Sequence, residues 1–174
     1  MPSYTAKGHL LVRNAGDNSV IGYVSKNISP VTSITPDVVV ALTVSITLPV
    51  GAMRGSQLNL AQVDSSNAFP SFGLAQGGYF YFSSTNDTPA GSSPQEPGNV
   101  ISDSFGAASS ESAIWTIDIV SGTAFPIWIN SDGVTAKVQL FIDRNVLHAS
   151  GDLNAYQAVS GPVTPITFTW VPAV

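Results

Sequence analysis

The sequence predicts an all-β protein, a single-domain antiparallel β-sandwich of roughly nine to eleven strands. Three observations support this prediction: polar and apolar residues alternate in several segments, β-branched and aromatic residues fill those segments, and turn-forming residues separate them. The apolar spacing of an amphipathic helix does not occur between them. With 174 residues, 44% of them hydrophobic, the chain is long enough to bury one core, so we expect one domain over residues 1–174.

The clearest predicted strand runs from Val38 to Leu48. Its even positions are all apolar, whereas most of its odd positions are small or hydroxylated. Alternation with a period of two is typical of a strand that buries one face. Pro36 precedes this strand and Pro49 follows it, and proline interrupts strand pairing. We therefore expect one long strand whose even positions are buried.

The chain opens with a predicted hairpin. Its strands are Tyr4–Asn14 and Val20–Lys26, joined by the turn-rich residues 14–18. The stretch Asn130–Gly133 contains an Asp-Gly pair, which supplies the positive φ angles of a tight turn between two further strands. The remaining predicted strands are Gln57–Val63, Gly78–Ser83, Ala113–Val120, Phe125–Asn130, Val134–Ile142, Val146–Ala149 and Pro165–Val171.

One stretch, at about residues 84–112, is rich in Gly, Ser and Pro and shows almost no alternation. Connections between strands are usually about 4–6 residues long, and much longer ones are commonly functional or disordered. We expect a long loop here, which serves as a lid, as a binding loop or as a solvated insertion.

Charge and composition exclude several classes of protein. Six Lys and Arg against eleven Asp and Glu give a net charge of −5, and the cations form no cluster suited to nucleic acid. No apolar run approaches the ~18 residues of a membrane-spanning helix, so we expect no transmembrane segment. The absence of cysteine excludes disulfides and thiolate metal sites. The first residues lack a signal-peptide pattern, so we expect a cytoplasmic or non-classically secreted protein, or one whose leader was removed.

Residues suited to catalysis are scarce. The two histidines, His9 and His148, lack the spacing of metal ligands, and no Gly-x-Ser-x-Gly nucleophile elbow occurs. His148 follows a predicted hairpin turn, where a solvated side chain is the usual outcome. We therefore expect a protein that is not an enzyme and has no metal or other cofactor.

A binding role has more support, which begins with two tyrosines. In the strand 78–83, Tyr79 and Tyr81 project to one side and the two phenylalanines to the other. The phenylalanines suit the core, so the tyrosines are left for the surface or a cleft. They lie next to Gly77 and Gly78, which allow a partner to approach closely.

Three further residues are candidates for ligand binding. Trp128 and Asn130 share one face of their predicted strand, and such a pair suits a sugar, because the ring stacks on its C–H face and the amide bonds its hydroxyls. Trp128 also fits the core of a second sheet. Asp118 lies on the face of its strand opposite Trp115, as a polar anchor or a solvated sheet residue.

The five candidate residues predict a non-catalytic binding protein with a glycan as its first ligand. One alternative is a carrier of a small aromatic or hydrophobic molecule, such as a pigment. Another is a membrane-active pore-forming or defence protein, because Val38–Leu48 has the length and alternation of a barrel strand. Three lysines are few for the defence of sheet edges, which favours a homo-oligomer, most simply a homodimer.

Two short runs resemble known proteins. The hexapeptide Gly22–Asn27 after the opening hairpin and the closing run Ile166–Trp170 resemble small cysteine-free β-rich proteins of mushroom-forming fungi. The resemblance implies a fungal protein with a β-rich fold. That group has no assigned activity or functional residues, so no site is transferred from it to this chain. Small fungal β-sandwich lectins offer an analogy for glycan binding.

Overall fold

The computed structural model describes residues 1–77 and 79–174, and its all-β architecture confirms the predicted fold class. Sixteen strands occur among the described residues, fourteen in one large antiparallel sheet and two in a separate ribbon. The predicted number of nine to eleven strands is therefore too low. Several predicted strands are each divided into two in the structure, and some observed strands have no clear alternation of polar and apolar residues. Gly78, at the start of one predicted strand, lies outside the described residues.

The described residues form the large sheet, the two-stranded ribbon and three helical elements. The large sheet contains β1 (Ser3–Asn14), β2 (Val20–Ile28), β3 (Thr32–Thr35), β4 (Val44–Pro49), β5 (Arg54–Leu58), β6 (Leu60–Gln62), β7 (Ser71–Gly77), β8 (Tyr79–Thr85), β9 (Ser109–Glu111), β10 (Trp115–Asp118), β11 (Thr123–Pro126), β14 (Gln139–Asp143), β15 (Val146–Ser150) and β16 (Thr164–Pro172). The ribbon consists of β12 (Trp128–Ile129) and β13 (Thr135–Ala136). The helical elements are the 3-10 helix η1 (Val38–Val40) and the α-helices α1 (Val100–Phe105) and α2 (Leu153–Ser160).

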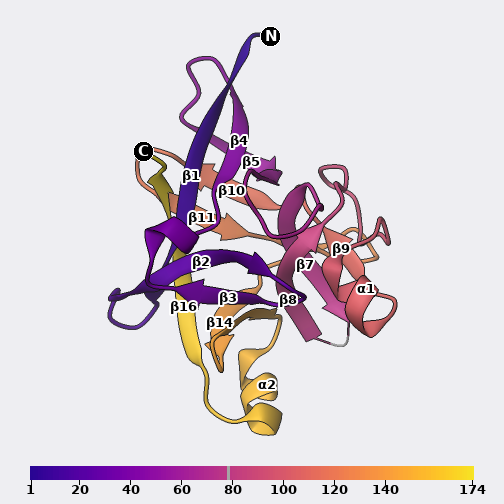
Figure 1. Ribbon diagram of the computed structural model, residues 1–174. Coiled ribbons are helices and arrows are strands. Elements are labelled where there is room, and N and C mark those ends of the chain that lie inside the picture. Colours follow the sequence, from indigo (N-terminus) through magenta and orange to yellow (C-terminus); the bar gives the residue numbers. More distant parts are fainter. Residues whose placement is uncertain (78) are drawn as a thin grey trace.

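The large sheet folds back on itself around the core. Its strand order is β3-β2-β1-β4-β6-β7-β8-β15-β14-β16-β11-β10-β5, with β9 on β7. Two additional pairings, β1–β16 and β3–β15, connect strands that are distant in this order. The long strand β1 pairs with β4 through its first half and with β2 and β16 through its second half (Figure 1).

An aromatic cluster forms the centre of the core. The rings of Phe72, Phe82, Trp115 and Phe168 lie with centroids 5.2–5.9 Å apart, in stacked, tilted and edge-on pairs. The Trp115 indole N–H donates to the carbonyl oxygen of Phe72 at 2.9 Å, so its one polar group is satisfied without water. This cluster joins β7, β8, β10 and β16.

The segment Val38–Leu48 is a 3-10 helix followed by a strand, and not the single long strand predicted. The Asp37 side chain accepts the N–H of Val39 at 2.9 Å and caps η1, which leaves Val38 and Val39 49% and 74% exposed. Even positions are buried only from Leu42 onward, and β4 begins at Val44. The local hydrogen bond that the Asp37 carboxylate accepts from Val39 outweighs a valine-rich pattern that suits a strand.

The Gly/Ser/Pro-rich stretch at 84–112 contains regular structure and buried contacts. It includes α1 and β9, which pairs with β7. Asn99 is fully buried, accepts the N–H of Ser102 to cap α1, and donates to the carbonyl oxygen of Ala108. The hydroxyl of Ser112 accepts the backbone N–H of Thr88 at 2.7 Å. These polar contacts fix residues 86–99 against the sheet although they contain no strand.

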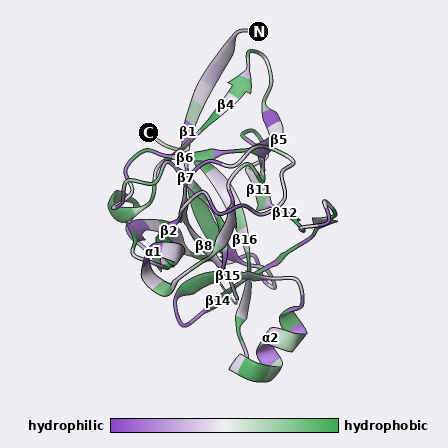
Figure 2. Ribbon diagram, turned by 90° about the vertical axis from the view of Figure 1, so that its right-hand side faces the viewer, coloured by the Kyte–Doolittle hydropathy of each residue, from purple (hydrophilic) through white to green (hydrophobic). Residues whose placement is uncertain are grey.

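Helix α2 was not predicted. Asp152 caps it by accepting the N–H of Ala155 at 2.9 Å. Figures 1 and 2 place α2 at the end of the molecule opposite the N terminus, beside β14. Within the described residues, no helix has the length and apolarity needed to span a membrane.

Candidate functional site

The candidate site lies where two strands separate from β16. On one edge of β16, β14 pairs at Thr164 and Pro165, and β11 pairs at Phe168 and Thr169. Ile166 and Thr167 lie between these two registers. Continued pairing would bring Pro126 of β11 opposite Ile166, and proline has no N–H to donate to a ladder. The strands therefore diverge and leave a groove along this part of β16.

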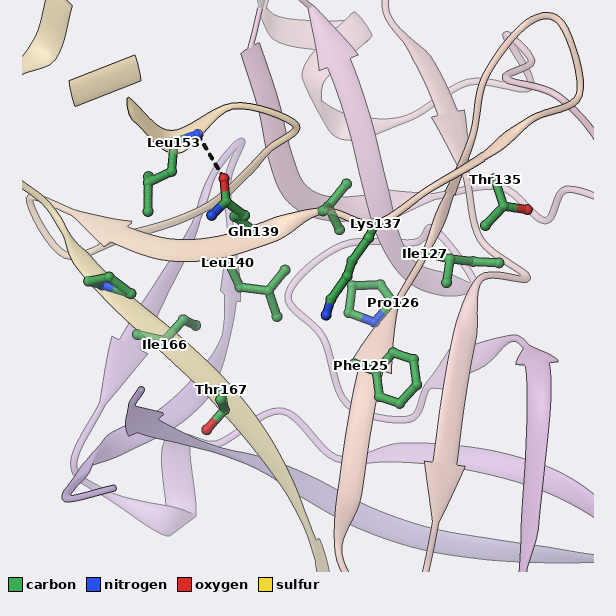
Figure 3. Close-up of a pocket in the computed structure, with 12 residues that line it drawn as sticks. Phe125, Pro126, Ile127, Thr135, Lys137, Gln139, Leu140, Leu153, Ile166 and Thr167 are labelled. Carbon is green, nitrogen blue, oxygen red and sulfur yellow. Dashed lines mark hydrogen bonds between the residues drawn. The ribbon is translucent and has the colours of Figure 1, made fainter. Parts of the chain in front are cut away.

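The groove is large and mostly apolar. Its volume is about 730 Å³, within the range of about 300–1,000 Å³ typical of small-molecule sites. Figure 3 shows side chains from β11, β14 and β16 around it, with Leu153 of α2 at one end. The lining residues are Phe125, Pro126, Ile127, Thr135, Lys137, Val138, Gln139, Leu140, Leu153, Pro165, Ile166 and Thr167.

Two polar residues differ in their role at this groove. The Gln139 side chain accepts the N–H of Leu153 at 2.9 Å and so fixes the start of α2 at the groove (Figure 3). Lys137 is the only charged residue of the lining, and its side chain extends toward the other lining residues. Within residues 1–77 and 79–174, Lys137 forms no ion pair.

A smaller cleft of about 260 Å³ lies beside α2. Tyr79 and Tyr156 form part of its wall, with ring centroids 5.3 Å apart and planes at 73°. The carboxylate of Asp143 accepts the hydroxyl of Tyr156 at 2.8 Å, which fixes this ring against the sheet. The remaining lining residues are Ser150, Asp152, Ala155 and Val159.

His148 lies beside Tyr156, with ring centroids 5.8 Å apart, and is buried, contrary to the solvated position predicted. Only 6% of its surface is exposed, and its ring stacks on Phe141 with centroids 5.3 Å apart. Its Nδ1 has no hydrogen-bond partner in the described structure. Burial lowers the pKa of His148, because the charged imidazolium is poorly solvated there.

The structure separates the five predicted site residues. Tyr79 and Tyr81 share one face of β8, as expected: Tyr79 is 47% exposed at the small cleft, and the half-buried Tyr81 contacts His148. Trp128 is 2% exposed and packs edge-on against Phe80 in the main core. None of the five lines the large groove.

The other two predicted residues lie at turns. Asp118 accepts the N–H groups of Val120 and Ser121, each at 3.0 Å, and these hydrogen bonds lower its pKa. Asn130 is exposed at the predicted turn, where its N–H donates to the carbonyl oxygen of Val134 and its carbonyl oxygen accepts the N–H of Gly133. The Asp118 side chain therefore stabilises its turn, whereas Asn130 takes part in its turn through its backbone.

Sequence reasoning missed the groove because its residues come from four separate segments and none of these segments forms a motif. The prolines Pro126 and Pro165 were the available signal, since each removes a backbone donor from a predicted strand. The described residues also contain no group of three His, Asp or Glu side chains arranged to hold a metal ion. No protein-family model, curated protein or solved structure matches the chain.

Proposed function

We propose that this protein binds a small apolar molecule in the groove between β11, β14 and β16. The observation that supports the proposal most directly is the groove of about 730 Å³ with a nearly uncharged lining. Concave apolar sites with a few polar groups are typical of small-molecule binding, because removing apolar surface from water drives association. The proposal favours the carrier alternative over the glycan that the sequence placed first.

A fluorescence titration with N-phenyl-1-naphthylamine, a neutral apolar probe, tests this proposal. We expect saturable binding to the wild-type chain with increased probe emission. Thr167→Trp places a large ring into the groove from an exposed position and should weaken binding at least tenfold. Thr47→Trp is the matched control, because Thr47 is exposed on β4 away from the groove. Absence of saturable binding to the wild-type chain would contradict the proposal.

Glycan binding is a second candidate function, located at the small cleft. The exposed ring of Tyr79 lies edge-on to Tyr156, with Ser150 and Asp152 nearby, and aromatic rings beside polar groups suit a sugar. A glycan array tests this proposal with wild-type protein and Tyr79→Ala. Phe105→Ala is the control, since Phe105 is an exposed aromatic residue outside the cleft. Equal binding by both variants would exclude this cleft as the sugar site.

A further inference from the structure

We propose that the ligand of the large groove carries a carboxylate, which pairs with the ammonium group of Lys137. This inference rests on the proposed function and adds the chemical class of the ligand to it. The groove is apolar over most of its lining, with Lys137 as the only charge. An amphipathic acid with an apolar body and one anionic head matches that arrangement.

The surroundings of Lys137 make it available to such a ligand. The neighbouring Val138 is buried in the main core and anchors the chain, whereas Lys137 itself is exposed. Three other cations already have partners: Arg144 lies 3.4 Å from Asp143, Lys26 donates to the carbonyl oxygen of Val39, and Arg13 bonds the hydroxyl of Thr169. No acidic residue lines the groove with Lys137.

The charge of the whole protein opposes an acidic ligand, so the attraction has to come from the one cation at the groove. The net charge of −5 repels an anion at long range, so an acidic ligand needs a local cation to bind in preference to a neutral one. A charge pair at the edge of an apolar groove is also less well screened than a pair on an open surface. A lone lysine therefore selects for an acid among molecules of equal apolar surface.

Displacement of N-phenyl-1-naphthylamine by dodecanoic acid and by dodecanol tests the inference, because the two competitors share a chain length and differ in charge. At neutral pH, we expect the wild-type protein to bind dodecanoate roughly tenfold more tightly than dodecanol, the order expected for one partly desolvated charge pair. Lys137→Met should remove this preference. The readout is the ratio of the dodecanoate and dodecanol affinities of each variant, which should fall to about one in Lys137→Met.

Two further variants separate charge from other effects. Lys137→Arg keeps the cation and should retain most of the preference for the acid. Lys7→Met removes an exposed lysine of β1 and should behave as wild type, although it changes the net charge equally.

The possible failures are distinct. A preference for dodecanoate that persists in Lys137→Met, or equal binding of both competitors by the wild-type chain, would overturn the inference and leave the proposed function intact. Failure of the wild-type chain to bind the naphthylamine and both competitors would overturn the proposed function, and the inference with it.

Discussion

Both carboxyl oxygens of Glu111 accept the backbone N–H of Ile129, at 3.2 and 2.9 Å. Glu111 ends β9 and Ile129 ends β12, so one buried side chain joins the 84–112 stretch to the strand that follows the groove residue Ile127. Burial raises the pKa of Glu111 to about 7, and the hydrogen bond from Ile129 opposes part of this increase. The carboxyl therefore changes its charge near neutral pH.

The Glu111→Gln variant should be more stable than wild type in weakly alkaline solution. The pKa is raised from 4.5 to about 7, so the folded state binds more protons than the unfolded state between these values. The protonated Glu111 carboxyl therefore makes its full contribution to the stability of the wild-type fold below pH 4.5. This contribution is lost as the pH rises through 7. Glutamine keeps the acceptor for Ile129 without the charge, and should raise the free energy of unfolding by about 3 kcal/mol at alkaline pH.

Urea denaturation across the pH range measures this difference. The gap between Glu111→Gln and wild type should be largest above neutrality and should narrow toward pH 4.5. A gap that is constant with pH would show that the two side chains differ in packing and not in charge.

His148 should make the fold sensitive to acid. Burial lowers its pKa below the ordinary 6.5, although a hydrogen bond to the backbone of Phe80 and the Asp143 carboxylate oppose the shift. The unfolded state then binds more protons as the pH falls below 6.5, so the free energy of unfolding decreases there. The tyrosines Tyr81 and Tyr156, which face the imidazole, remain neutral in this range.

His148→Phe should remove this acid sensitivity, because phenylalanine preserves the stacking on Phe141 and cannot be protonated. The comparison is best made in the Glu111→Gln background, since Glu111 titrates in an overlapping range. His9→Phe is the matched control, because His9 lies on β1 beside Tyr23 and does not contact the aromatic residues around His148. An unchanged pH dependence in His148→Phe would contradict the prediction.

The sequence predicted those parts of the fold that depend on local alternation. The opening hairpin, the division of the β8 aromatic residues between two faces and the Asn130–Gly133 turn all agree with the structure. The prediction of a strand over Val38–Leu48 is wrong for its first residues, because the side-chain cap of η1 competes with strand pairing. The alternation of polar and apolar residues does not reveal such a cap.

The groove depends on pairings between distant segments, which local sequence patterns do not predict. Which strands share the edge of β16 follows from the topology, and the gap at Ile166 follows from where two registers end. Helix α2 is only eight residues long, too short for a clear helical period, yet it contributes Leu153 to the groove and Tyr156 to the smaller cleft. Pairings between distant segments decide both sites.

Gly73→Ala should be strongly destabilising. A Cβ at Gly73 would overlap the carbonyl oxygen of Glu111, which belongs to the strand paired with β7. The backbone of β9 would have to move, so we expect a loss of about 2–3 kcal/mol in the free energy of unfolding. Gly151→Ala is the control, since its Cβ would meet no atom within 4 Å. Similar denaturation midpoints for the two variants would contradict this account of the β7–β9 contact.

Pro126→Val should narrow the groove by restoring a backbone donor. Ala124 is in register with Phe168, so a residue two positions further along β11 is placed to pair with Ile166. Valine supplies the N–H that proline lacks and favours a strand, so β11 should extend along β16 into the space of the groove. We expect slow hydrogen exchange at the new amide of residue 126 and at least fivefold weaker binding of N-phenyl-1-naphthylamine. An amide that is protected while probe affinity stays unchanged would show that the probe binds elsewhere, because an extended ladder and an open groove cannot occupy the same edge of β16.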